Sequence, residues 1–263
     1  MNRKVINWTL RFVVTGLILL GFLVGVVLNP FLVYANETEL GKCVVYHNEP
    51  LEENLKFRLD NAIEILKASE LYDPTIKFDI CLNDGSFYPS LLEIFMGKAF
   101  ALGFTSNKVA ICGELNCKDN YVQVNGQKWN FTQLLAHEEA HCLVFHRVGF
   151  WKSNPVANNP NWKWEGYPEY IARRDSSQMD LVKNIEQLRD AIKTDKDAWG
   201  IRLPDSTISP REYFNYRLLN QYCIEIKRMS FENLLKDTTS EQTLQNEMMN
   251  WYFEQKNKSY RFN

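Results

Sequence analysis

One feature limits this chain before any other: an apolar run from Phe12 to Ala35, broken only by a threonine and an Asn-Pro pair. Roughly 20 apolar residues are enough to cross a bilayer as a helix. Basic residues precede the run and are expected to stay in the cytoplasm, at Arg3, Lys4 and Arg11. The pattern predicts a membrane anchor that sends the rest of the chain to the extracytoplasmic side, periplasmic or extracellular.

A cleaved signal peptide is the alternative for the same segment. Val33-Tyr34-Ala35 has the small-residue spacing of a cleavage site, and cleavage there would give a secreted protein. The core from Phe12 to Leu28 is longer than most signal-peptide cores, which favours an uncleaved anchor. We therefore divide the chain into residues 1–35, a cytoplasmic tip with an anchor or signal, and a folded body over 36–263.

The body is long enough for one well-packed catalytic domain. A net charge of -2 gives no reason to expect a nucleic-acid partner. The membrane, through the N-terminal helix, is an expected partner, and the sequence leaves the oligomeric state open.

Six cysteines fit an oxidising compartment, where disulfide bonds persist. Cys112 and Cys117 enclose a short loop that a bridge would close. By elimination Cys43 would pair with Cys81, and Cys142 with Cys223. Six cysteines allow many connectivities, and buried free thiols are the alternative.

The patterning of the body changes at Asn130. Residues 43–129 mix strand alternation with short amphipathic helices, and residues 130–263 are almost wholly helical in pattern, which together predict an α+β fold. Asn130 is a plausible N-cap with Gln133 three residues later. The expected strands are 43–46, 76–82, 100–104, 108–112 and 121–124; the expected helices are 52–69, 90–96, 131–147, one from near Trp164, one marked by residues 181–192, 212–228 and 231–236.

The predicted helix 131–147 carries the segment His137-Glu138-Glu139-Ala140-His141. Residues four apart on a helix share one face, so both imidazoles can reach one zinc ion. Glu138 lies beside them, where it can accept a proton from water at the metal. Two histidines hydrogen-bonded within a core are the structural alternative.

A catalytic zinc site takes a third protein ligand and keeps one position open. The metzincin arrangement fails here, because Val144 and Arg147 stand where it needs a glycine and a histidine. His146 points to another side of the helix and is expected at the surface or behind the ligands.

Downstream, the segment Trp162 to Ala172 reads WKWEGYPEYIA. It resembles the W-x-x-E-G-x-x-E-Y-x-A helix of gluzincins, the metallopeptidases that include the M1-type aminopeptidases. The resemblance implies a zincin-like fold, Glu165 as the third zinc ligand, and Glu169 as a partner of a ligand histidine or a substitute ligand. The segment from His141 to Glu165 is longer than in M1 enzymes, and the loop from Phe150 to Asn161 would absorb the difference.

Gluzincins often place a tyrosine near the start of a later helix, where its hydroxyl stabilises the oxyanion. Tyr213 matches that position best and Tyr216 next, while packing of a helix interface is the alternative for either. The resemblance thus implies a zinc peptidase that acts on a peptide or protein, with Glu138 as general base. We expect a strand between Phe100 and Glu114 to present an open edge along which an extended peptide can lie.

The G-x-M-E-N motif that binds the substrate amine in M1 aminopeptidases is absent from the sequence. Its absence favours an endopeptidase or a specialised processing enzyme. The competing hypothesis is an envelope-anchored protein whose zinc site is structural or inert and which acts as a binding or assembly module. A third interpretation, a membrane protein that mainly anchors a partner, would be favoured if no zinc is bound.

Overall fold

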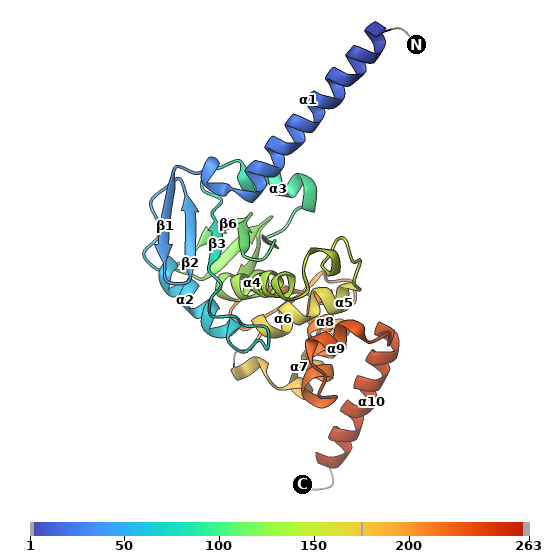
Figure 1. The fold of residues 1–263 in the computed structure, drawn as a ribbon. Helices are drawn as coiled ribbons and strands as arrows, with labels where there is room; N and C mark the ends of the chain where they lie inside the picture. Colours follow the sequence, from blue (N-terminus) through green and yellow to red (C-terminus); the bar gives the residue numbers. More distant parts are fainter. Residues whose placement is uncertain (1–2, 175, 260–263) are drawn as a thin grey trace.

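The computed structural model describes residues 3–174 and 176–259, and shows a mixed α+β body from which one long helix projects (Figure 1). That helix, α1 (Arg3–Leu28), contains an 18-residue window, Arg11–Leu28, that is apolar enough to cross a membrane or to be a signal sequence. A short 3-10 helix, η1 (Pro30–Leu32), connects α1 to the body.

A five-stranded mixed sheet forms the upper part of the body, in the order β1-β2-β3-β5-β4. The three inner strands are parallel, and the two outer strands pair antiparallel to their neighbours. The outer strand β1 was not expected from the sequence, because its polar residues show no apolar alternation. The strands are β1 (Asn36–Leu40), β2 (Cys43–His47), β3 (Phe78–Cys81), β4 (Ala101–Phe104) and β5 (Lys108–Ile111).

The two faces of this sheet pack against different helices. Side chains of a strand alternate between faces, and the face with Val45, Ile80 and Val109 packs under α2 (Leu55–Leu66) and α4 (Phe131–Val148). The opposite face, with Tyr46, Cys81 and Ala110, packs against the end of α1 and against α3 (Tyr88–Met96). The sheet therefore separates the helix with the histidines from the apolar N-terminal helix.

A three-stranded antiparallel meander leads into α4. Its second turn is Asn125-Gly126, both with positive φ, which is the dipeptide that two-residue hairpin turns favour. At the end of the last strand, the Asn130 side chain accepts a hydrogen bond from the Gln133 backbone N–H, so the predicted N-cap is confirmed. The strands are β6 (Glu114–Asn116), β7 (Tyr121–Val124) and β8 (Gln127–Asn130).

The C-terminal half is mainly helical, but it contains a short hairpin, β9 (Gly200–Arg202) with β10 (Ile208–Pro210), that the helical pattern did not predict. The predicted helix over 212–228 ends its regular part at Gln221 and continues as a π-helix, η4 (Tyr222–Ile226). The other elements are η2 (Phe150–Lys152), α5 (Asn161–Trp164), α6 (Gly166–Ala172), η3 (Ser176–Gln178), α7 (Leu181–Thr194), α8 (Arg211–Gln221), α9 (Phe231–Lys236) and α10 (Glu241–Ser259).

The expected disulfide pairings do not form: all six cysteines are free thiols within residues 3–174 and 176–259. Cys81 stands opposite Tyr46 in the β2–β3 register, three residues along the strand from Cys43. Three residues of strand span about 10 Å, more than the ~7 Å Cα separation that a disulfide tolerates. Likewise Cys112 and Cys117 are held apart by the extended strand β6 between them. The Cys142 thiol lies 3.3 Å from the Lys108 carbonyl oxygen rather than near Cys223.

Candidate metal centre

The helix α4 brings two imidazoles together inside the body. It is buried along most of its length, and His137 and His141 lie one turn apart on the same side. Their Nε2 atoms are 3.2 Å apart. At this distance either one Nε2 donates a proton to the other, or both Nε2 lone pairs point at a common cation.

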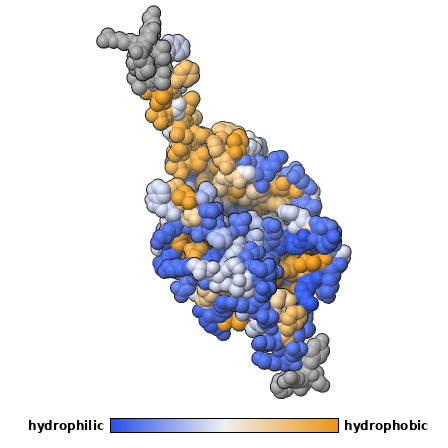
Figure 2. Space-filling model, turned by 90° about the vertical axis from the view of Figure 1, so that its right-hand side faces the viewer, coloured by the Kyte–Doolittle hydropathy of each residue, from blue (hydrophilic) through white to orange (hydrophobic). Residues whose placement is uncertain are grey.

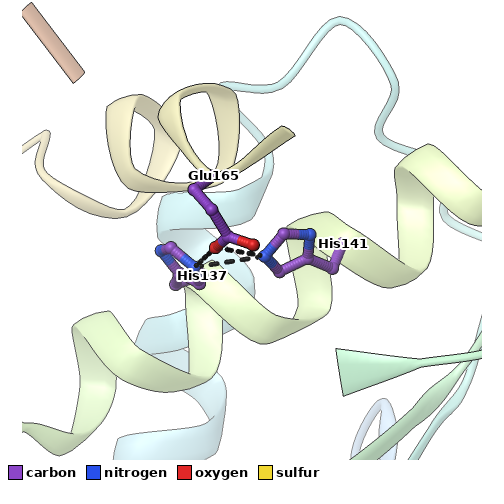
Figure 3. A group of neighbouring side chains, drawn as sticks. All are labelled: His137, His141 and Glu165. Atoms are coloured by element: carbon purple, nitrogen blue, oxygen red, sulfur yellow. Dashed lines mark hydrogen bonds and ion pairs between the residues drawn. The ribbon is translucent and has the colours of Figure 1, made fainter. Parts of the chain in front are cut away.

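Glu165 completes the group from the joint between α5 and α6 (Figure 3). Its Oε2 lies 3.2 Å from the Nε2 of His141 and 3.4 Å from the Nε2 of His137. The next residue, Gly166, lets α6 approach α8 closely, because a Cβ there would stand 2.7 Å from the Tyr216 carbonyl oxygen. These three side chains form a cluster that could hold a metal ion.

A buried chain of polar groups fixes the orientation of His137. Its Nδ1 lies 3.0 Å from Oε2 of Glu169, so a proton on Nδ1 leaves the Nε2 lone pair facing Glu165. Oε1 of Glu169 accepts hydrogen bonds from Arg173 Nε at 2.8 Å and from Ser209 Oγ at 2.9 Å. Arg173 also donates to Gln133, one turn before His137 on α4.

The electrostatics of the cluster favour a positive charge at its centre. Burial alone would raise the pKa of Glu165, but the charges and hydrogen bonds of His141 and His137 lower it well below its usual range. Burial alone would lower the pKa of His137, but hydrogen bonds to Glu165 and Glu169 raise it to about 10. A proton or a metal ion between these side chains is therefore stabilised.

Glu138 lies beside the histidines and is held by the backbone of β4. Its Oε2 accepts a hydrogen bond of 2.6 Å from the Gly103 N–H. A Cβ at Gly103 would stand 2.4 Å from the Glu138 carbonyl oxygen, so the contact between β4 and α4 requires a glycine. Burial raises the pKa of Glu138, while the charges of the two histidines and the Gly103 N–H oppose that rise.

Tyr213, in the first turn of α8, lies against the same group. Its ring stacks on that of His137, with centroids 5.8 Å apart and planes 2° from parallel, and meets Trp129 edge to face. Burial, followed by the charges of Glu165 and Glu138, raises its pKa far above the usual range, so the hydroxyl keeps its proton. Tyr213 lines the cleft beside the cluster.

This cleft has a volume of about 1310 Å³, and Glu138, His137, His141 and Glu165 lie in its wall. The outer strand β4 runs along it, and the hydrogen bond from Gly103 to Glu138 shows that alternate backbone groups of β4 point away from β5. An extended chain in the cleft would therefore meet backbone donors and acceptors.

The structure brings together six of the side chains that the sequence singled out, from three separate segments: His137, Glu138, His141, Glu165, Glu169 and Tyr213. Tyr216, the second candidate for the oxyanion, is not among the residues that line the cleft. His146 lies apart, with its side chain 52% exposed and 3.9 Å from Asp73. Three residues that support the site were not predicted from the sequence: Gly103, Arg173 and Ser209. The contact of Arg173 could have been predicted from the sequence, since a Glu and an Arg four residues apart on a helix commonly pair. No local signal marks Gly103 or Ser209.

No protein-family model, curated protein or solved structure matches this chain. The geometry of the site therefore carries the functional argument.

Proposed function

We propose that this protein is a zinc-dependent peptidase of the gluzincin type, with a zincin-like body and with His137, His141 and Glu165 as zinc ligands. One observation carries the proposal: the three ligand atoms lie 3.2 to 3.4 Å from one another. Zinc bonded to nitrogen and oxygen at about 2.0–2.1 Å in a tetrahedron sets its ligand atoms about 3.3 Å apart. The fourth corner is left for a water or substrate oxygen.

The bound ion would supply Lewis-acid polarisation of the scissile carbonyl and a lowered pKa for water at the site. Glu138 accepts the proton of the attacking water and passes it to the leaving amine. The hydrogen bond from Gly103 holds that carboxylate in place. Tyr213, which keeps its hydroxyl proton, donates to the oxygen on which negative charge develops.

The size of the cleft and the edge of β4 support a polypeptide substrate. A peptide that adds a strand to an open edge is held by its main chain. Such binding does not need a free substrate amine, and it accords with an endopeptidase or processing enzyme that lacks the amine-binding motif of M1 aminopeptidases.

A structural or inert zinc site is the second candidate function. Structural zinc sites are usually closed by four protein ligands, whereas this cluster has three among the described residues. A buried carboxylate held by a backbone N–H beside the ligands has no task in a purely structural site. Both features favour hydrolysis over a binding or assembly role.

Exchange of Glu138 tests the proposal. We expect Glu138→Gln to keep its zinc and to lose about 10²- to 10⁴-fold in hydrolysis of a mixed peptide library, because the amide cannot accept the proton. Glu139→Gln, one residue along the same helix, should change the rate by less than about threefold, since Glu139 faces the core. If Glu138→Gln cleaves as fast as the parent, the proposed role is wrong; zinc without hydrolysis in the parent would favour the structural site.

A further inference from the structure

Exposed apolar side chains gather where α1 meets the body. On α3, Ile94 is 76% exposed and Phe95 is 61% exposed, and Met96 follows them. On η1, Phe31 and Leu32 are exposed as well. Figure 2 shows the apolar surface of α1 continuing into this patch at the base of the helix. An exposed apolar patch of this kind on a folded domain marks a site of contact with a membrane or with another protein.

The end of α1 is fixed to the body rather than joined to it by a flexible linker. Val26 is buried in the same cluster as Tyr34, Tyr88 and Leu92. The Tyr88 hydroxyl donates to the Val27 carbonyl at 2.6 Å, and the Tyr34 hydroxyl donates to the Leu82 carbonyl at 2.8 Å. These contacts set the direction of α1 relative to the cleft, and they would be lost if residues 1–35 were removed.

The length of the apolar window leaves no spacer between membrane and body. Its 18 residues end at Leu28 and extend about 27 Å as a helix, close to the ~30 Å of a bilayer's hydrocarbon core. Contacts with the body begin at Val26, before the window ends. If α1 spans a bilayer, α3 lies at its surface.

The loop between α4 and α5 forms the opposite rim of the cleft. Its 3-10 helix η2 carries Phe150, which lines the cleft, and Trp151, which is 79% exposed. Tryptophan is enriched at membrane–water interfaces. In Figure 1 this loop and α3 lie toward the side of the body from which α1 extends.

One cleft joins the base of α1 to the metal cluster. Leu28, the last residue of α1, and Met96 of α3 line the same cleft as His137 and Glu138. A cleft with these walls opens beside the helix that is apolar enough to span a membrane.

We propose that α3, η1 and η2 rest on the bilayer that α1 spans, and that the cleft between them takes a polypeptide held at that same bilayer. The bilayer is favoured over a soluble partner because the patch continues the apolar surface of α1 and begins where the apolar window ends. The substrate class rests on the proposed function; the membrane contact does not.

Photo-crosslinking of the full chain in phospholipid vesicles tests the contact without need of catalysis. We expect p-benzoylphenylalanine at Phe95 or at Trp151 to form lipid adducts detectable by mass spectrometry. The control position is Phe253, 47% exposed on α10, which lies at the far end of the molecule from α1 (Figure 1). Lipid adducts at Phe95 and Trp151 no more frequent than at Phe253, or adducts with a second copy of the chain instead, would overturn the proposal.

The orientation of the cleft is tested with two substrates anchored in the same vesicles. One joins a cleavable peptide to a transmembrane helix by a linker of about 5 residues, and the other by about 40, reaching at most roughly 17 Å and 130 Å. We expect the short-linker peptide to be cleaved at least as fast. Cleavage of the long-linker peptide alone would contradict the membrane-facing cleft. Lipid adducts without cleavage of either peptide would uphold the contact and refute hydrolysis.

Discussion

Two neighbouring glutamates of α4 have opposite surroundings. Glu138 faces the cleft, accepts a hydrogen bond from the Gly103 N–H and lies beside both histidines. Glu139 is completely buried in the core, and neither of its carboxylate oxygens has a hydrogen-bond partner in the described part of the chain. One step along a helix turns a side chain by about 100°, which is enough to separate a carboxylate in the wall of the cleft from one in the core.

Burial raises the pKa of both carboxyl groups, but only the surroundings of Glu138 contain groups that oppose the rise. Burial alone raises the pKa of Glu139 well above its usual value, so it sits in the core as a neutral acid. For Glu138 the histidine charges and the Gly103 N–H oppose the effect of burial and favour the carboxylate. The comparison shows that position relative to β4 and the cleft, rather than residue type, distinguishes the two glutamates.

The largest effect should come from Gly103→Ala, which displaces the strand that holds the Glu138 carboxylate. The added Cβ would stand 2.4 Å from the Glu138 carbonyl oxygen, so β4 must move away from α4. We expect hydrolysis to fall about 10³-fold, as for loss of the general base, and unfolding to become easier by about 1–3 kcal/mol.

Peptide hydrolysis and thermal unfolding measure these two effects. Gly25→Ala is the control, because a Cβ there meets nothing within 4 Å. If Gly103→Ala hydrolyses peptides at the parental rate, the support of Glu138 by β4 is not needed.

Next in size is Tyr213→Phe. Loss of the hydroxyl should lower kcat about 10²-fold while zinc content stays the same, because the donor acts on charge that develops in the transition state. Tyr216→Phe is the matched control, since Tyr216 lies on the same helix but not among the residues that line the cleft. If the two variants hydrolyse peptides with equal kcat, Tyr213 has no role in the mechanism.

The smallest effect concerns the stability contributed at Glu139. Its folded-state pKa is raised, so above about pH 4.5 the folded protein keeps a proton that the unfolded chain has released. The unfolding free energy of the parent should therefore fall as pH rises, by up to about 1.4 kcal/mol per pH unit. Glu139→Met should lack this slope and be more stable than the parent by about 1–3 kcal/mol at pH 8.

Urea unfolding in detergent micelles from pH 5 to pH 8 measures this difference. The same pH dependence in both proteins would show that Glu139 is not a neutral buried acid.

The local parts of this account could be read from the sequence. The spacing of His137 and His141, the cap at Asn130 and the extent of α4 depend on residues within one helix. The convergence of Glu165 depends on packing of α6 against α4 and α8, and only a motif resemblance pointed to it. The disulfide predictions were wrong because spacing along the chain carries no information on strand register, and the docking of α1 beside α3 left no local signal.

Zinc content of the full chain is the most direct test of the central claim. We predict a single zinc ion per chain by elemental mass spectrometry in the parent and in His146→Ala, whose side chain is on the same helix but exposed and apart from the cluster. His141→Ala should lose the ion. A parent that binds no zinc or holds iron instead, or a His141→Ala variant that keeps its full zinc content, would contradict the account.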